Sequence, residues 1–390
     1  MADDARRREP RAFVVAPEPN DWLRLVLDVL RNSGPVEVFA PWVLPRPLIA
    51  LGRRVGFVRR RDGRELPGTH GHGWFTAAEL LLRGFARGKT AATLSNRVRM
   101  RALVDHAAAF RIARGTAPSL IVAPSLAARR CFAQARRAGS TCLLVEDMPD
   151  FDTMVDGLDA LAAQLPQATF LRNHRPSGHA HARQRAERWQ ADVVGVRGRV
   201  AWQRVGGNKA RVQVPRTVVT DRGRRGRDVL FAGPPLARCG SAQLPALLDA
   251  LEDITIRVLP GPCSEPPSLQ RHPRIQVHRG ADLDGIGAVL SLSPLESHPA
   301  QVTRALDAGV PIVGTTASTG VVTPSSILRV EDSSSRVLAD AISQALEGRG
   351  PVPQPWQAPQ SLAQYVVESS RTLETNSAST PSVRTSVPTT

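Results

Sequence analysis

The sequence predicts an α/β protein made of two doubly wound domains, each with a parallel sheet. Three observations carry this prediction. The chain has 390 residues, which is too long for one ordinary core and suits two domains of roughly 150–200 residues each. Short apolar runs alternate with amphipathic segments, as in parallel sheets with crossover helices. The alternation restarts after a polar, arginine-rich run at 220–228.

The first half opens with a strand, a turn, a helix and a second strand, which is how a doubly wound domain begins. The stretch 46–89 is rich in Arg, Gly and His and gives no clear pattern. Strands are predicted at 11–16, 36–39, 119–123, 141–145, 191–196 and 211–215, and helices at 22–31, 94–114 and 127–138.

The second half repeats this order, with strands at 228–232, 254–259, 275–277, 286–292, 310–313 and 327–330, and helices at 242–252, 302–308 and 336–346. The last residues are rich in Ser, Thr, Pro and Gln, and too few apolar residues follow position 369 for packing. The predicted units are a disordered N-terminus (1–10), a first domain (11–219), a linker (220–228), a second domain (229–350) and a largely disordered C-terminal extension (351–390).

The chain carries a formal net charge of +16 at pH 7. A basic surface attracts polyanions such as nucleic acid, anionic lipid headgroups or nucleotide phosphates, although codon bias at exposed positions explains the charge equally well. Nucleic-acid binding needs clustered basic residues with aromatic stacking platforms, which one Tyr and dispersed Phe residues do not offer. Contact with an anionic membrane therefore stays open, whereas nucleic acid is not favoured.

The cysteines and the apolar runs narrow the class of protein further. The four cysteines form no C-x-x-C pair, so neither a zinc ribbon nor a redox motif is expected. No apolar run is long enough to span a membrane, and the N-terminus lacks the apolar core of a signal peptide. We expect a cytoplasmic protein, with any membrane contact being peripheral at the inner face.

Candidate functional residues follow from their position after predicted strands. In open α/β sheets, polar groups just past the strand C-termini line the ligand crevice. Glu146 and Asp147 follow a predicted strand, although helix capping or a turn explains them as well. His174 is a further candidate, with a structural or surface role as its alternative. His179 and His181 are two residues apart and do not face each other on a helix, so no metal site is predicted.

Residues 228–322 contain four motifs, DVLFAG (228–233), PLARCG (235–240), SPLE (293–296) and RALDAGVPIV (304–313). In this order they resemble the donor-binding domain of retaining GT-B glycosyltransferases of the family 4 type, also described as the glycosyltransferase family 1 domain. The first half is more loosely similar to the acceptor domains of that group, through 122–151 and 186–196.

The resemblance implies two Rossmann-like domains facing a cleft and a nucleotide-diphosphate sugar as donor substrate, with no cofactor and no metal. The loop after Gly233 would bring backbone N–H groups and a helix N-terminus to the diphosphate, with Arg238 as a fixed cation. Glu296 would accept hydrogen bonds from sugar hydroxyls. The donor-binding residues implied are Gly233, Arg238, Gly240, Glu296, Ser297, His298, Arg304 and Gly309.

Three positions depart from the family pattern. Arg304 stands where the family usually has a Glu bound to the ribose, so a hydrogen-bond acceptor has become a cation that only donates. Cys239 replaces the usual Lys, for which the adjacent Arg238 is a substitute. The loop after Glu296 is normally glycine-rich, and here it contains Pro299, which has no N–H. Either Arg304 pairs with a phosphate of the donor, or the chain is a degenerate copy.

The resemblance therefore predicts a hexosyltransferase that acts with retention of configuration on an unknown glycan, lipid or small-molecule acceptor, in cell-envelope or glycan biosynthesis. A catalytically degenerate GT-B binding protein is the main alternative. A charge-driven nucleic-acid binder and an epimerase on the same fold are further alternatives. The sequence identifies no nucleophile, and the catalytic candidates are Glu296, His174 and Glu146.

Overall fold

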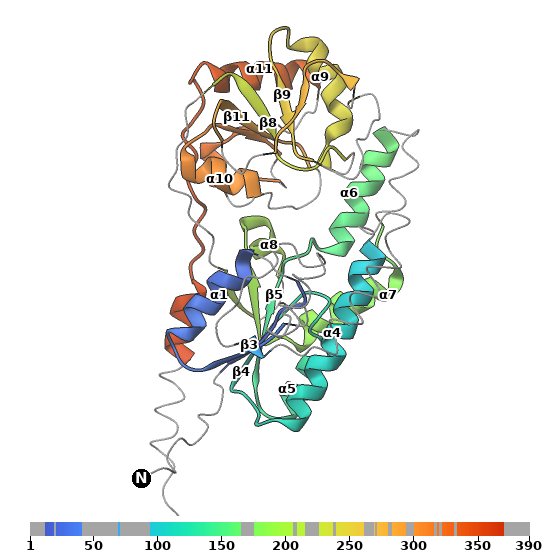
Figure 1. Ribbon diagram of the computed structural model, residues 1–390, viewed down its shortest axis with the longest axis vertical. Coiled ribbons are helices and arrows are strands. Elements are labelled where there is room, and N and C mark those ends of the chain that lie inside the picture. Colours follow the sequence, from blue (N-terminus) through green and yellow to red (C-terminus); the bar gives the residue numbers. More distant parts are fainter. Residues whose placement is uncertain are drawn as a thin grey trace, which may run out of the picture.

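The computed structural model shows two lobes, the N-terminal half of the chain below and the C-terminal half above (Figure 1). The described residues are 12–18, 21–40, 69–70, 94–164, 175–205, 209–214, 226–236, 239–260, 269, 271–279, 283–293, 300–315, 318–319, 322–330 and 334–369.

The N-lobe is built on a parallel sheet of seven strands in the order β3-β2-β1-β4-β5-β6-β7. Strands β1 and β6 are apolar and buried along their whole length, and β4 and β5 are buried except at their first residue, because helices cover both faces of the sheet. The register places Val14 of β1 beside Val38 of β2 and Val122 of β4. The strands are β1 (Ala12–Val15), β2 (Val36–Phe39), β3 (Thr69–His70), β4 (Leu120–Pro124), β5 (Thr141–Val145), β6 (Val193–Val196) and β7 (Ala210–Gln213).

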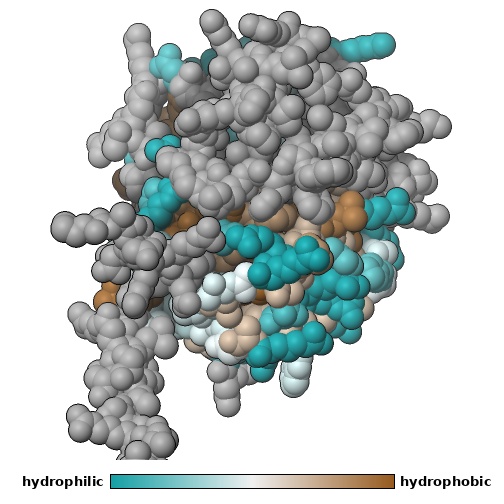
Figure 2. Space-filling view, turned by 60° about the horizontal axis from the view of Figure 1, so that its bottom comes forward, coloured by the Kyte–Doolittle hydropathy of each residue, from teal (hydrophilic) through white to brown (hydrophobic). Residues whose placement is uncertain are grey.

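Two apolar layers hold helices against this sheet. One face packs on α4 (Leu94–Arg114), α5 (Arg129–Arg137) and α8 (Arg199–Arg204). The other face packs on α1 (Asp21–Arg31), whose Trp22, Val26 and Leu27 are buried. Further helices are α6 (Phe151–Gln164) and α7 (Gly178–Gln190). The lower end of the molecule is largely hydrophilic where its residues are described (Figure 2).

The C-lobe repeats the plan with six parallel strands in the order β10-β9-β8-β11-β12-β13. Helices α9 (Leu244–Ala250) and α11 (Ser335–Leu346) cover one face, and α10 (Ala300–Ala308) covers the other. Short helical turns are η3 (Ser241–Gln243) and η5 (Pro324–Ser326). The strands are β8 (Asp228–Phe231), β9 (Ile256–Val258), β10 (Ile275–Val277), β11 (Ile286–Ser291), β12 (Ile312–Gly314) and β13 (Leu328–Arg329).

The segment 351–369 joins the two lobes a second time (Figure 1). On the C-lobe, Thr323 donates its backbone N–H to the Gln354 carbonyl at 2.8 Å. On the N-lobe, the backbone N–H of Gln213 donates to the Gln360 carbonyl at 2.9 Å, and Leu362 is buried against β1 and α1. The chain therefore returns to its first lobe after completing the second.

The structure confirms two doubly wound parallel domains, and most predicted strands and helices lie within about two residues of their observed positions. Helices α6, α7 and α8 were not predicted. The start signal of α6 was present and was missed, because Asp150 directly precedes the helix and accepts the backbone N–H of Thr153 at 3.1 Å. Within the predicted C-terminal extension, 351–369 are described and packed, whereas 370–390 lie outside the described residues. Residues 1–10 and 220–225 also lie outside them.

Candidate functional site

The carboxyl ends of the two sheets point toward each other. Helix α8 directly follows β6 and lies at the end of the lower lobe nearest the upper lobe, while α10 follows β11 and lies at the facing end of the upper lobe (Figure 1). In addition, Ala242 of η3 packs against an apolar cluster of the N-lobe that includes Met154 and Leu158 of α6. Ligands of doubly wound sheets bind at this end of the strands, so the facing edges define the candidate site.

On the N-lobe, polar groups from three strand ends converge on Arg101 of α4, whose side chain is fully buried. Its guanidinium donates to Asp147 at 2.6 and 2.8 Å and to the Ser125 carbonyl at 2.7 Å. Burial alone would lower the pKa of Arg101, but the carboxylates of Asp147 and Glu18 raise it above its usual value. Arg101 is therefore a permanent buried cation that ties β4 and β5 to α4.

Glu18, which follows β1, is the more accessible member of this group, with a side chain 31% exposed. Its carboxylate accepts hydrogen bonds from Arg97 at 2.8 and 3.0 Å and from Arg101 at 3.1 Å. Burial raises the pKa of Glu18, but the two arginines outweigh it, and the pKa lies below its usual value. Glu18 is therefore an ionised hydrogen-bond acceptor at the carboxyl edge of the sheet.

The predicted candidate Glu146 is held differently. Its side chain is almost fully buried, and Arg188 of α7 donates to both Glu146 and Asp150. Burial raises the pKa of Glu146 above its usual value even though Arg188 opposes this effect. Asp147, the neighbouring candidate, is bound to Arg101. Both candidates thus sit at the carboxyl edge, as expected, and both are engaged in ion pairs.

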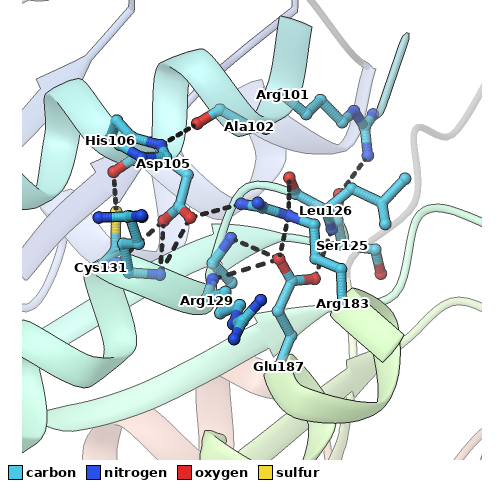
Figure 3. Close-up of polar contacts among 12 residues, drawn as sticks. Arg101, Ala102, Asp105, His106, Ser125, Leu126, Arg129, Cys131, Arg183 and Glu187 are labelled. Atoms are coloured by element: carbon cyan, nitrogen blue, oxygen red, sulfur yellow. Dashed lines mark hydrogen bonds and ion pairs between the residues drawn. The ribbon is translucent and has the colours of Figure 1, made fainter. Parts of the chain in front are cut away.

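The N-terminus of α5 lies at the same edge and is occupied by carboxylates of the chain itself (Figure 3). Asp105 accepts from the backbone N–H groups of Arg130 at 2.9 Å and Cys131 at 2.9 Å. Glu187 accepts from the backbone N–H groups at 126, 128 and 129, at 2.5, 3.1 and 3.2 Å.

Arg183 of α7 lies between these two carboxylates. Its Nη2 donates to Asp105, and its Nε lies 3.2 Å from Glu187. Burial raises the pKa of Glu187 to about 7, although Arg183 and the backbone N–H groups lower it. A helix N-terminus after a strand is a ready anion site. In this domain the carboxylates of Asp105 and Glu187 occupy that site, so its role is structural.

Leu126 is held by the same network in a rare backbone conformation. It is fully buried with φ of 69°, which is costly for a residue with a Cβ atom. Its N–H is bound by Glu187, and its carbonyl accepts from Arg183 Nε at 2.9 Å. The turn after β4 is therefore fixed from both sides, which sets the position of Ser125 at the edge.

On the C-lobe, the predicted donor glycines lie at the carboxyl edge of the sheet. Gly233 follows β8 with φ of 153°, and Gly240 has φ of 88°. A Cβ atom at Gly240 would lie 2.5 Å from the Leu292 Cβ and 2.6 Å from its carbonyl oxygen. Only glycine allows this approach. The loop after β8 is thereby packed against the residues that follow β11, the neighbouring strand.

Hydroxyl groups gather where β11 and β12 end. The Thr315 hydroxyl donates to the Ser293 carbonyl at 2.8 Å, and the Ser318 hydroxyl donates to the Ser291 carbonyl at 2.7 Å. The buried Ser291 Oγ has no hydrogen-bond partner within the part of the chain that the structure describes. Sequence analysis missed this group, although several Ser and Thr residues directly after two apolar strands were a visible signal.

Two further predicted donor residues belong to α10. Arg304 lies on its second turn, half-buried, and forms no ion pair or hydrogen bond with another described residue. Gly309 ends the helix with φ of 68°, and the next residue, Val310, donates its N–H to the Ala305 carbonyl at 2.9 Å. This geometry is that of a common helix C-terminus, so the turn accounts for Gly309 without a ligand.

Five further residues were predicted to belong to the site. Arg238, Glu296, Ser297, His298 and His174 all lie outside the described residues. The described neighbours of the first four, from Cys239 to Gly240 and from Leu292 to Ser293, lie together at one edge of the C-lobe. The structure therefore brings together one end of each predicted donor loop, at Gly240 and at Leu292.

Sequence analysis also missed Glu18, Arg97 and Arg101. Glu18 follows the first buried strand, which is the same signal that identified Glu146. The two arginines lie on a long helix that is rich in arginine, and nothing in the pattern distinguishes them from exposed ones. Among the described residues, no group of His, Cys, Asp or Glu could hold a metal ion, and no described helix is long and apolar enough to cross a membrane.

No protein-family model matches the chain, and no curated protein matches it. Several solved structures do match the chain. Sucrose-phosphate synthase from Thermosynechococcus elongatus is 14% identical with a TM-score of 0.53, covering 94% of this chain and 95% of that one. Arabidopsis thaliana UGT89C1, complexed with UDP, is 10% identical with a TM-score of 0.50, covering 94% and 100%. TcCGT1 in complex with UDP is 11% identical with a TM-score of 0.50, covering 93% and 94%.

These similarities extend over nearly the whole of each chain, so they include both lobes and not one Rossmann-like domain alone. The sequence identities are low, and the shared property is the arrangement of the backbone. This agrees with the two parallel sheets, their facing carboxyl edges and the return of 351–369 to the first lobe. The chain has the GT-B fold of glycosyltransferases.

Proposed function

We propose that the chain transfers a sugar from a nucleoside-diphosphate donor to an acceptor, with retention of configuration. The observation that carries the proposal is the contact between Gly240 and Leu292, which joins the loops after β8 and β11 at the edge facing the N-lobe. Both UDP-bound structures with the same fold support a nucleotide as ligand. We assign the donor to the C-lobe edge and the acceptor to the N-lobe edge.

The donor site needs positive charge for the departing diphosphate. When the bond between the anomeric carbon and the diphosphate oxygen breaks, negative charge develops on that oxygen, and fixed cations and dipoles stabilise it. We assign this role to Arg304, which no described carboxylate neutralises, and to Arg238 in the loop after β8. Glu296 follows β11 and is assigned to the sugar hydroxyls.

On the acceptor side, we assign Glu18 as the group that binds the acceptor hydroxyl. Its carboxylate stays ionised because Arg97 and Arg101 lower its pKa, and an ionised carboxylate accepts hydrogen bonds from hydroxyls. The acceptor oxygen then bonds to the anomeric carbon as the bond to the diphosphate oxygen breaks, and the hydroxyl proton passes to the departing diphosphate, which gains negative charge in this step. Glu146 is less suited to this role because it is buried and bound to Arg188.

A panel of nucleotide sugars in a thermal-shift assay tests the proposal. A ligand that binds only the folded state raises the melting temperature by mass action. We expect a UDP-sugar or GDP-sugar to raise it, with free nucleoside diphosphate as product when an acceptor is added. Glu296→Ala is expected to keep the fold and lose sugar turnover. If no nucleotide or nucleotide sugar shifts the melting temperature, the proposal is wrong.

The second candidate is a GT-B binding protein without transferase activity. The substitution of the usual ribose-binding Glu by Arg304 favours it. This candidate predicts that a nucleotide or sugar ligand stabilises the fold, whereas no nucleoside diphosphate is released from any donor. Product release measured beside the thermal shift distinguishes the two functions.

A further inference from the structure

The outward faces of α4 and α5 form one basic surface on the N-lobe. The two helices pack side by side on the same face of the sheet. Within them, the only acidic residue is Asp105, which is fully buried between them. Arginines therefore dominate the outward faces, and their charge has no compensation from the same helices.

Five of these arginines are exposed and lack a partner carboxylate among the described residues. They are Arg99 and Arg114 on α4, and Arg129, Arg130 and Arg137 on α5. By contrast, Arg111 is paired with Glu37 at 2.9 Å, and Arg136 lies 3.8 Å from Asp192. We call the five unpaired arginines, together with Leu103 and Phe110, the α4–α5 surface.

Two large hydrophobic side chains stand out from this basic surface. Leu103 is 45% exposed and Phe110 is 57% exposed, and they lie seven positions apart on α4. Positions seven apart lie on one stripe of a helix. The Arg114 guanidinium lies 4.0 Å from the centre of the Phe110 ring. Hydrophobic tips beside guanidinium groups suit the boundary between lipid headgroups and acyl chains.

We propose that the α4–α5 surface docks on an anionic lipid bilayer. The arginines would bind lipid phosphates, and each basic residue near such a surface adds to the attraction. Leu103 and Phe110 would enter the acyl boundary, where their apolar area is removed from water. Nucleic acid fits this surface less well, because two outward helix faces offer one aromatic ring, and single strands are bound by series of stacking platforms.

The docking surface also bears on the acceptor. Helix α4 carries Arg97 and Arg101, which hold Glu18 at the carboxyl edge, and the exposed stripe begins at Arg99 of the same helix. A lipid-borne acceptor on the bilayer would therefore approach the assigned acceptor site. That last step rests on the proposed function, whereas the docking itself does not.

Vesicle flotation of the full chain tests the docking. The vesicles contain phosphatidylcholine alone or phosphatidylcholine mixed with phosphatidylglycerol. We expect binding to the anionic vesicles only, weakened as salt is raised. Arg130→Glu with Arg137→Glu should lower the affinity by about tenfold or more, and Leu103→Asn with Phe110→Ser should also lower it. The control pair, Arg336→Glu with Val337→Ser, changes exposed residues of α11 on the other lobe and should bind like the wild type.

Melting temperatures confirm that each pair is folded, and the two surface pairs test the same face independently. Equal binding to neutral and anionic vesicles, or wild-type binding by both surface pairs, overturns the proposal. Binding to duplex DNA and not to vesicles also overturns the proposal. In that case Leu103→Asn with Phe110→Ser would leave the binding to DNA unchanged. A nucleotide-sugar thermal shift on the same samples reports on the proposed transferase separately, so either idea can fail alone.

Discussion

The Glu187 carboxylate lies 2.5 Å from the backbone nitrogen of Leu126 and holds that residue at a φ of 69°. This contact couples α7 to the turn after β4. The same carboxylate accepts two more backbone N–H groups at the start of α5 and is paired with Arg183. A single side chain thus satisfies donors from a strand end and from a helix start, and places both at the carboxyl edge.

Removal of this side chain should be strongly destabilising. Glu187→Ala leaves buried N–H groups without acceptors and leaves Arg183 with one carboxylate instead of two. Breaking a buried ion pair typically costs about 3–5 kcal/mol. Urea denaturation followed by circular dichroism measures the loss. The matched control is Glu347→Ala, which removes an exposed carboxylate paired with Arg349 and should change the free energy of unfolding by less than about 1 kcal/mol.

The same residue should make stability depend on pH. Burial raises the folded-state pKa of Glu187 to about 7 from its ordinary value of 4.5. Between these values the folded chain keeps a proton that the unfolded chain has lost, so the free energy of unfolding falls as pH rises through this window. The slope from one group is at most about 1.4 kcal/mol per pH unit. Glu187→Gln, which cannot ionise, should reduce that slope; an unchanged slope would contradict the assignment.

Substitution of two glycines of the C-lobe distinguishes the cost of backbone strain from the cost of a packing collision. Gly309→Ala places a Cβ atom at φ of 68° with no atom within 4 Å, so only conformational strain of about 1–2 kcal/mol is expected. Gly240→Ala adds a collision with Leu292 and should cost clearly more. It should also abolish stabilisation by the nucleotide, because it separates the loops after β8 and β11. Melting temperatures measured with and without nucleotide compare the two variants. Equal losses of stability in Gly309→Ala and Gly240→Ala would argue against a packed donor loop.

The fold was predictable because its strands are short apolar runs between clear turn signals, as at Thr141–Val145, and such runs depend little on distant residues. The buried polar network was not predictable from the sequence. Asp105, Arg183 and Glu187 lie on helices that read as solvent-facing by composition, and only the packing of α4, α5 and α7 buries them together. Glu18 carried the same signal as Glu146, but its partners Arg97 and Arg101 lie about 80 residues away, beyond any local pattern.

Glu18→Gln tests the acceptor side. The amide keeps the size of the side chain but loses the charge that attracts a hydroxyl proton, and hydrogen bonds to charged groups are worth about 1.5–3 kcal/mol. We expect sugar transfer to fall by about tenfold or more, with nucleotide binding unchanged, because we assign the donor to the other lobe. Transfer rates and nucleotide affinity are measured on the same preparation. A fall in nucleotide affinity with normal transfer at saturation would place Glu18 outside the acceptor site.

Arg304→Glu tests how the donor is held. The assigned role of Arg304 is to pair with the diphosphate, so reversal of its charge should weaken nucleotide binding by about tenfold or more, through the lost charged hydrogen bond and the new repulsion. Isothermal titration of the nucleoside diphosphate measures the change. Arg271→Glu changes an exposed arginine that precedes β10 and therefore lies at the amino end of that strand, so the same charge change there should have little effect. The opposite result, tighter binding by Arg304→Glu, would mean that this position contacts the ribose and that a carboxylate there restores the contact. The charge at position 304 therefore decides between a diphosphate-binding arginine and a weakened ribose site.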